Sequence, residues 1–216
     1  VRMENITAVD FSQRPFRLTV ANGEVVEAAS VIVATGARAN WIGLANELRL
    51  SKIGGGVSAC AVCDGALPCF RNQHLIVVGG GDSAVEEADY LSKFAAKVTL
   101  VVRRNQMRAS QIMQARILEN PKAEMAWNKV VVDVLGDDFI TGVRLQDTVT
   151  GALSDQACGG LFVAIGHTPN TAFLADQLAL NNKGYVVCAK GWRTLTSVDG
   201  VFAAGDVMDD YFRQAI

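Results

Sequence analysis

Residues 75–84 read Leu-Ile-Val-Val-Gly-Gly-Gly-Asp-Ser-Ala, and this stretch decides the fold. Its apolar start predicts a buried strand, and its run of glycines predicts a tight turn that leads into a helix. Gly79 and Gly81, with a small residue three positions further on, fit the dinucleotide fingerprint, in which glycines let a pyrophosphate approach the backbone. Ser83 and Glu86 also fit a capping box at the helix start. The stretch therefore predicts a nucleotide site in an α/β domain.

A group of arginines follows the next predicted strand. The apolar run 98–102 comes one helix length after the glycine turn and is followed by Arg103, Arg104 and Arg108. A cofactor without a 2′-phosphate would be held here by an acidic side chain that bonds the ribose hydroxyl, whereas arginines pair with phosphate. We therefore expect NADPH rather than NADH. The alternative is that these arginines form a solvated helix start.

A pair of cysteines precedes the glycine turn. Cys60 and Cys63 are separated by two residues, a spacing that can close a small disulfide ring and reopen it, as a two-electron redox couple requires. Asp64 follows directly and could exchange the proton that thiol chemistry needs. The alternative is half of a zinc site, but no second ligand pair is visible in the sequence. We favour a redox dithiol and expect no metal.

The composition limits the possible functions. The chain has 216 residues, 50% of them hydrophobic, which is enough for one large or two small domains. Its 20 basic and 22 acidic residues give no basic stripe of the kind that binds nucleic acid. No apolar run approaches a membrane span, and the first residues have no signal-peptide pattern. Five cysteines with one close pair do not suggest a secreted disulfide framework, so we expect a cytoplasmic protein.

The remaining segments predict short strands and turns. Asn22-Gly23 indicates a hairpin with a type I′ turn, and residues 37–56, which end in three glycines, are predicted to be an irregular linker into the next domain. Further strands are expected over residues 16–20, 25–28, 31–34, 130–134, 142–146, 161–165, 185–188 and 201–204, and helices over 83–97 and 110–119. This order implies a parallel β/α/β core with a small antiparallel excursion.

Two of the predicted strands end in small residues. Thr35-Gly36 follows the run 31–34, and Gly205-Asp206 follows the run 201–204. Small residues at the carboxyl edge of a strand leave room for a ligand. Asp206 could accept hydrogen bonds from ligand hydroxyls, although an aspartate that caps the following segment is the ordinary alternative.

Together these motifs resemble the low-molecular-weight thioredoxin reductases. The resemblance rests on residues 60–65, 79–84, 103–104, 108–110, 166–170 and 201–216. It implies an α/β homodimeric flavoprotein in which a Rossmann-like NADPH domain is inserted into an FAD domain. It assigns residues 1–53 and 178–216 to the FAD domain, and residues 54–177 to the NADPH domain with the dithiol.

The same resemblance implies how electrons pass from NADPH through FAD to the dithiol and on to thioredoxin. Cys63 would be the sulfur nearest the flavin, Cys60 the sulfur that attacks the thioredoxin disulfide, and Asp64 the acid/base. The residues implied to hold NADPH are Gly79, Gly80, Gly81, Asp82, Ser83, Arg103, Arg104, Arg108, Ile165 and Gly166. Those implied to line the flavin are Ala34, Thr35, Gly36, Gly205, Asp206, Arg213, Gln214, Ala215 and Ile216. A rotation of the inserted domain about glycines 54–56 is also implied.

Two segments of the family pattern are missing from this sequence. The family opens with its own glycine turn for the FAD pyrophosphate and continues beyond the last residues into a final helix. We therefore expect a fragment of a longer protein with an incomplete FAD domain. Two alternatives stay open: a peroxiredoxin-reducing flavoprotein of the same superfamily, and a nucleotide-binding module without turnover. The other cysteines, Cys69, Cys158 and Cys188, are expected to be buried small hydrophobic residues.

Overall fold

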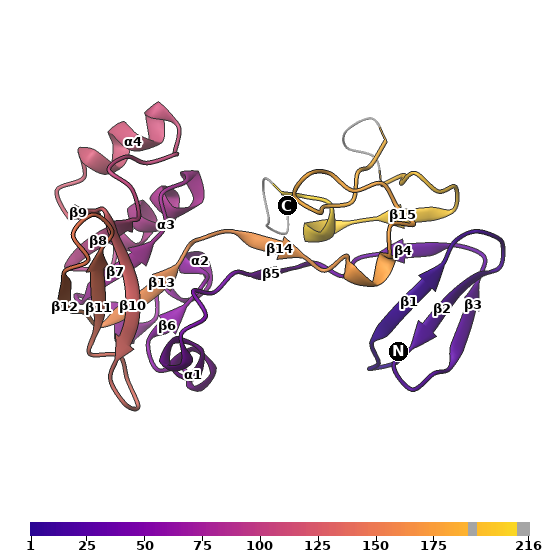
Figure 1. The fold of residues 1–216 in the computed structure, drawn as a ribbon, viewed down its shortest axis with the longest axis horizontal. Helices are drawn as coiled ribbons and strands as arrows, with labels where there is room; N and C mark the ends of the chain where they lie inside the picture. Colours follow the sequence, from indigo (N-terminus) through magenta and orange to yellow (C-terminus); the bar gives the residue numbers. More distant parts are fainter. Residues whose placement is uncertain (190–193, 211–216) are drawn as a thin grey trace. The chain divides into compact units, whose positions relative to one another are not determined.

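The computed structural model describes residues 1–189 and 194–210 (Figure 1). Contacts divide the chain into two units. The first unit combines residues 1–38 with the chain from residue 167 onward, and the second is Ala39–Gly166. The second unit is therefore inserted, in sequence, into the first.

A five-stranded sheet forms the centre of the second unit. Its strand order is β6-β13-β7-β8-β9, and the neighbouring strands pair in parallel. The strands are β6 (Val57–Ser58), β13 (Gly160–Val163), β7 (His74–Val78), β8 (Lys97–Val102) and β9 (Ala123–Trp127). Every residue of β8 after Lys97 is buried, as expected for a parallel sheet that is covered on both faces. The sheet and its crossover helices confirm the predicted α/β class.

Successive residues of β7 point into two different cores, because side chains alternate across a strand. Leu75 and Val77 belong to the core under the helices, whereas Ile76 belongs to the core on the opposite face. The helices on the first face are α3 (Asp82–Ser92) and α4 (Gln111–Leu118), which lie next to one another in Figure 1. The second face is covered by the antiparallel strands β10 (Lys129–Leu135), β11 (Gly142–Asp147) and β12 (Leu153–Ala157), with α1 (Ala45–Ile53).

Short strands around a separate core form the first unit. They are β1 (Ile6–Asp10), β2 (Phe16–Val20) and β3 (Val25–Ala28), which are antiparallel, β4 (Val31–Val33) parallel to β15 (Val201–Ala203), and β5 (Ala37–Ala39) paired with β14 (His167–Pro169). One-turn 3-10 helices are η2 (Ala172–Leu174) and η3 (Gly205–Val207) here, and η1 (Pro68–Phe70) in the second unit. The strand predicted over residues 185–188 is wrong. Val186 makes one isolated bridge, and its N–H donates to the carbonyl of Val207.

The linker predicted over residues 37–56 is also wrong, because nine of these residues form α1. Glu47 organises the start of this helix. Its carboxylate is buried and accepts hydrogen bonds from the backbone N–H groups of residues 42–44 at 2.8 to 3.0 Å. Those amides have no partner within the helix, so the side chain supplies the missing acceptors.

Burial of α1 moves the unit boundary. Leu50 is fully buried in the core that also contains Val57, so α1 belongs to the second unit. At the other boundary Leu174 packs in the core of the first unit. The units therefore divide after residues 38 and 166. The assignment of residues 1–53 and 178–216 to an FAD domain and of residues 54–177 to an NADPH domain stays a prediction.

Two predicted local motifs take another form. Gly23 has a φ of 88° but Asn22 does not have a positive φ, so the hairpin turn is not type I′, which needs both. The capping box at the start of α3 is absent. The helix begins at Asp82 with Gly81 as its N-cap, and no side chain caps it, so Ser83 already lies inside the helix.

Candidate functional site

The dithiol lies on a single helical turn. Cys60 is the N-cap of α2 (Ala61–Asp64), and its sulfur is joined to that of Cys63 in a disulfide. The turn brings the two Cα atoms to 5.3 Å, and the N–H of Cys63 donates to Sγ of Cys60 at 3.2 Å. Sulfurs that are bonded to one another are not available as thiolate ligands for zinc. The pair is therefore in the oxidised form of a dithiol couple.

Ser58 ties Asp64 to the dithiol, and the sequence interpretation missed it. The buried hydroxyl of Ser58 donates to Oδ2 of Asp64 at 2.6 Å and accepts the N–H of Cys60 at 3.0 Å. The end of β6 therefore fixes the carboxylate and the first cysteine together. A serine two residues before Cys60 is the local side-chain-to-backbone pattern that could have revealed this contact.

The glycine turn at the end of β7 combines one crowded position with one open position. A Cβ on Gly79 would lie 2.4 Å from the carbonyl oxygen of Ala164 and 2.6 Å from Cβ of Ala84. A Cβ on Gly81 would meet no atom within 4 Å. The crowded glycine lets strand, turn and helix pack closely, and the open one leaves its backbone accessible. This is the division of roles that a pyrophosphate site needs, so these residues fit a dinucleotide.

The arginine segment is hydrogen-bonded to this turn. The carbonyl of Gly80 accepts the N–H groups of Arg108 and Ala109 at 2.6 and 3.1 Å. Oδ1 of Asp82 accepts the N–H of Ser110 at 2.8 Å, so this predicted cofactor residue holds the loop instead of being free. These bonds place the loop after β8 beside the glycine turn.

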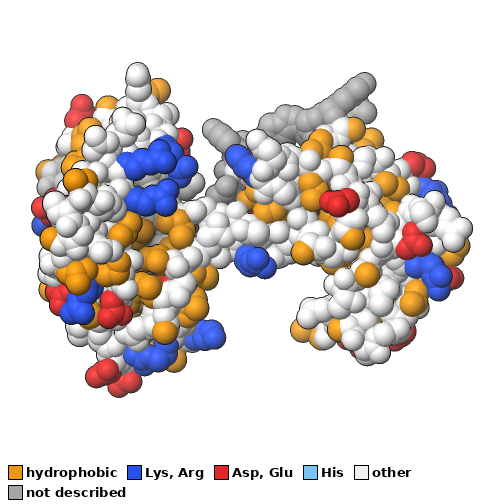
Figure 2. Space-filling model, viewed as in Figure 1, with side chains coloured by type: hydrophobic (Ala, Val, Ile, Leu, Met, Phe, Trp, Pro, Cys, Tyr) orange, Lys and Arg blue, Asp and Glu red, His pale blue; other side chains and the backbone are white. Residues whose placement is uncertain are grey.

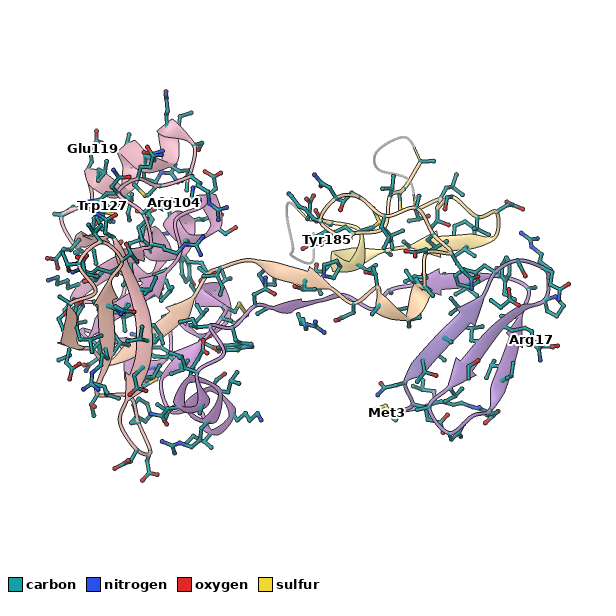
Figure 3. The ribbon with its side chains drawn as sticks, in the orientation of Figure 1. Met3, Arg17, Arg104, Glu119, Trp127 and Tyr185 are labelled. Atoms are coloured by element: carbon teal, nitrogen blue, oxygen red, sulfur yellow. A yellow bond between two sulfur atoms is a disulfide. The ribbon has the colours of Figure 1, made fainter. Side chains whose placement is uncertain are left out.

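The three arginines of this loop are exposed cations. Among the described residues, no ion pair involves Arg103, Arg104 or Arg108. Figure 2 shows Lys and Arg side chains gathered on the second unit in the region where Figure 3 labels Arg104. Unpaired guanidinium groups beside an open glycine turn are suited to binding phosphate.

The remaining residues predicted to bind nucleotide are near the same edge of the sheet. Ile165 and Gly166 follow β13, which pairs in parallel with β7, so they and the glycine turn follow the carboxyl ends of adjacent strands. Ile165 is exposed, and Gly166 has a φ of 100°. Ser83 is exposed on the first turn of α3.

In the first unit, the residues predicted to line the flavin come from two adjacent strand ends. β4 and β15 are parallel, so Ala34 and Gly205 follow strands that end at the same edge. Gly36 and Gly205 have φ of 65° and 75°, and a Cβ on either would meet nothing within 4 Å. The Thr35 hydroxyl donates to the carbonyl of Asn170 at 2.8 Å. Asp206 lies beside this edge in η3. The predicted residues Arg213, Gln214, Ala215 and Ile216 lie outside the described residues.

The other three cysteines differ from one another in exposure. Cys158 is buried as predicted, and burial raises the pKa of its thiol to about 11. Cys188 is half-buried, and burial also raises its pKa. The prediction for Cys69 is wrong, since it is exposed. It lies in η1, which turns its side chain away from the core that holds the neighbouring Phe70.

Within the described ranges, no group of three or more His, Cys, Asp or Glu side chains is arranged to hold a metal ion. None of the helices described combines the length and apolar character needed to cross a membrane.

The chain matches the family described as "Pyridine nucleotide-disulphide oxidoreductase" over residues 1–216. A thioredoxin reductase of Dictyostelium discoideum is 50% identical over 219 residues, which cover 100% of this chain and 67% of the relative. Thioredoxin reductase 2 of Arabidopsis thaliana is 50% identical over 218 residues, which cover 99% of this chain and 56% of the relative. Solved thioredoxin reductases from Giardia duodenalis and Streptococcus pyogenes match with TM-scores of 0.84 and 0.82, each at 38% identity. Both matches cover 98% of this chain, and 68% and 67% of the solved chains.

Proposed function

The chain belongs to the pyridine nucleotide-disulphide oxidoreductase family, among the thioredoxin reductases, and from this premise we propose that its Cys60–Cys63 disulfide takes electrons from NADPH through FAD and passes them to thioredoxin. The observation that carries the proposal is a disulfide on one helical turn, in the same unit as an open glycine turn flanked by free arginines. Thioredoxin is preferred over peroxiredoxin as the substrate because the relatives are named thioredoxin reductases.

The two units divide the cofactors between them. The second unit binds NADPH, with its phosphates at the glycine turn and its 2′-phosphate at Arg103, Arg104 and Arg108. The first unit contributes the edge formed by residues 34–36 and 205–206 to the FAD site. When bound, NADPH supplies a hydride and FAD passes two electrons on to the disulfide. The chain works as a homodimer in the cytoplasm, as the family resemblance and the cysteine content favour.

The chain's own residues carry the disulfide chemistry. Reduction breaks the bond between Cys60 and Cys63, and two electrons with one proton leave one sulfur as a thiol and the other as a thiolate. Asp64 exchanges one proton with the dithiol, while Ser58 holds its carboxylate in place. The Cys60 thiolate then attacks a thioredoxin sulfur, and Cys63 displaces Cys60 from the mixed disulfide. The internal disulfide re-forms, and thioredoxin leaves with two thiols.

Replacing Cys63 with Ser tests the exchange step. We expect the variant to bind NADPH with unchanged affinity but to lose thioredoxin reduction, because no internal disulfide can form. The measurement is NADPH oxidation at a fixed FAD concentration with thioredoxin, and with a peroxiredoxin as the competing substrate. Cys69→Ser is the matched control and should keep wild-type activity. Reductase activity in Cys63→Ser would exclude the dithiol as the exchange site.

Replacing Arg103 and Arg104 with Ala tests the nucleotide assignment. A hydrogen bond to a charged group contributes about 1.5–3 kcal/mol, so the pair should lower NADPH affinity by roughly 100-fold or more. NADH affinity should change by less than about 3-fold, since NADH has no 2′-phosphate. Arg116→Ala, on the exposed face of α4, is the control. Equal losses for both nucleotides would contradict a 2′-phosphate site.

A further inference from the structure

Glu87 is a half-buried acid near the dithiol, and the disulfide chemistry proposed for Cys60, Cys63 and Asp64 does not use it. It lies on α3, and the backbone N–H of Ala61 is close enough to favour its charged form. Its Oε2 atom is buried and has no hydrogen-bond partner. Among the described residues, the one other buried side-chain atom of this kind is the hydroxyl of Tyr185, in the first unit. A carboxyl oxygen left without a partner at this position needs an explanation.

Tight packing of α2 on α3 fixes this carboxyl next to the sulfurs. Ala61 lies between the two cysteines, and its amide belongs to the peptide bond that follows Cys60. Ala61 is buried in the same core as α3, and a Cβ on Gly65 would lie 2.6 Å from a side-chain carbon of Leu91. The two helices are therefore in close contact, with no room for a side chain at Gly65. The Glu87 carboxyl therefore faces the residue that directly follows Cys60.

The environment of Glu87 disfavours its charge. Burial raises the pKa of this carboxyl to about 7, and the negative charge of Glu86 adds to the effect, whereas the Ala61 N–H opposes it. The titratable residues on the elements packed against α3 or on α3 itself are Asp64, His74, Asp82, Glu86, Asp89, Tyr90, Lys97, Arg116 and Glu124. Of these, Glu86 is the one that shifts the Glu87 carboxyl. No basic side chain lowers the pKa of Glu87, so a new negative charge on α2 would raise that pKa further.

We propose that Glu87 is a positioning residue that balances the charge of the dithiol, binding a proton when the disulfide is reduced and releasing it when the disulfide closes. The inference rests on the redox role of the dithiol. In the step, two electrons break the bond between the sulfurs of Cys60 and Cys63. One sulfur takes a proton and becomes a thiol, the other remains a thiolate, and the Glu87 carboxylate takes a second proton from solvent. The net charge of the three groups is the same before and after.

The physical reason is that two anions close together repel, and that the repulsion is stronger where one of them, here Oε2 of Glu87, is shielded from water. Coupling between sites is reciprocal, so a thiolate that favours protonated Glu87 is itself favoured by protonated Glu87. Neutralising Glu87 should therefore increase the thiolate fraction, but only at a pH where the wild-type carboxyl is ionised.

The test measures alkylation of the phosphine-reduced chain by iodoacetamide, without NADPH, FAD or thioredoxin, so its outcome is independent of the proposed reductase activity. Peptide mapping follows Cys60 and Cys63 in a Cys69→Ser background. Glu87→Gln keeps an acceptor for the Ala61 N–H, and we expect it to raise the alkylation rate several-fold at about pH 8 and hardly at all at about pH 6. Glu86→Gln, the matched loss of an exposed charge on the same helix, should change the rate less than about 2-fold. The same ratio at both pH values, or equal effects of the two variants, would overturn the proposal.

A second measurement needs no variant and so does not depend on whether Glu87→Gln folds. Carbon-13 NMR titration of the wild-type glutamate carboxyls should show that Glu87 ionises at higher pH in the reduced chain than in the disulfide form. The other glutamates should titrate identically in the two forms. An unchanged Glu87 titration would refute the coupling.

Discussion

Substitutions of Gly79 and Gly81 should have different effects: the first should lower the stability of the fold, and the second should weaken nucleotide binding. A methyl group on Gly79 would lie 2.4 Å from the carbonyl oxygen of Ala164 and 2.6 Å from Cβ of Ala84, and neither atom belongs to a flexible side-chain end. The φ of Gly79, 151°, is also one that other residues rarely adopt. Overpacking costs about 1–3 kcal/mol, and a strained backbone about 1–3 kcal/mol more. We expect Gly79→Ala to destabilise the second unit by roughly 2–6 kcal/mol.

Gly81→Ala should act in the opposite way. Its new methyl group would meet no protein atom within 4 Å, and its backbone φ is −98°. Alanine is a poorer N-cap than glycine, but the loss of stability should stay below about 1 kcal/mol. The methyl group would instead occupy the open side of the turn, where the phosphates approach. NADPH should therefore bind at least 10-fold more weakly, a change of about 1.4 kcal/mol in binding free energy.

Thermal unfolding followed by circular dichroism, together with NADPH titration by calorimetry, measures both effects. For a chain of this size, a loss of 1 kcal/mol lowers Tm by about 2–4 °C, so Gly79→Ala should unfold roughly 4–24 °C below the wild type. Gly81→Ala should unfold within about 4 °C of it. A Gly79→Ala variant with wild-type Tm, or a Gly81→Ala variant with wild-type affinity, would refute this division of roles.

Two further predictions concern the buried titratable groups. The folded pKa of Glu87, about 7, lies above its ordinary value of 4.5, so folding is favoured below pH 4.5 and this contribution is lost as the pH rises through about 7. Glu87→Gln should remove about 3 kcal/mol of this pH dependence in urea unfolding, and identical pH dependence in both proteins would contradict the assignment. With the disulfide intact, a chromogenic disulfide reagent should label exposed Cys69 rapidly, whereas buried Cys158, with its pKa of about 11, should react only on unfolding. Cys69→Ser should remove the rapid phase, and rapid labelling of Cys158 would show that its core opens readily.

The parts of the fold that depend on local sterics were predictable from the sequence. The glycine turn after β7 and the strands over residues 16–20 and 25–28 follow from residue type and alternation, and the structure has them at these positions. The helix α1 was not predictable in this way. Leu50 is its one buried apolar residue, and its N-cap is Leu44, whose side chain cannot accept a hydrogen bond, so the start depends on Glu47, which reaches back to the amides of residues 42–44.

The dithiol itself was recognisable from the spacing of its cysteines, but its supporting residues were not. Ser58 contacts Asp64 only because a one-turn helix folds back onto the end of β6. Glu87 meets Ala61 only because α2 packs on α3, and the sequence places Glu87 on a helix assigned to the nucleotide. Contacts of this kind arise from packing between segments, which periodicity does not encode.

The helix α3 serves both sites of the second unit. Its first residues follow the glycine turn, and Ala84 fills the space that Gly79 leaves beside Ala164. One turn further on, Glu87 faces the Ala61 amide, and α2 packs on α3, so the glycine turn and the dithiol turn both contact the same helix. Because close-packed interiors transmit displacements instead of absorbing them, a helix displaced at its start should also move the carboxyl that faces the dithiol. Gly79→Ala should therefore change the alkylation rate of the dithiol. Gly81→Ala, which displaces no protein atom, should leave that rate unchanged.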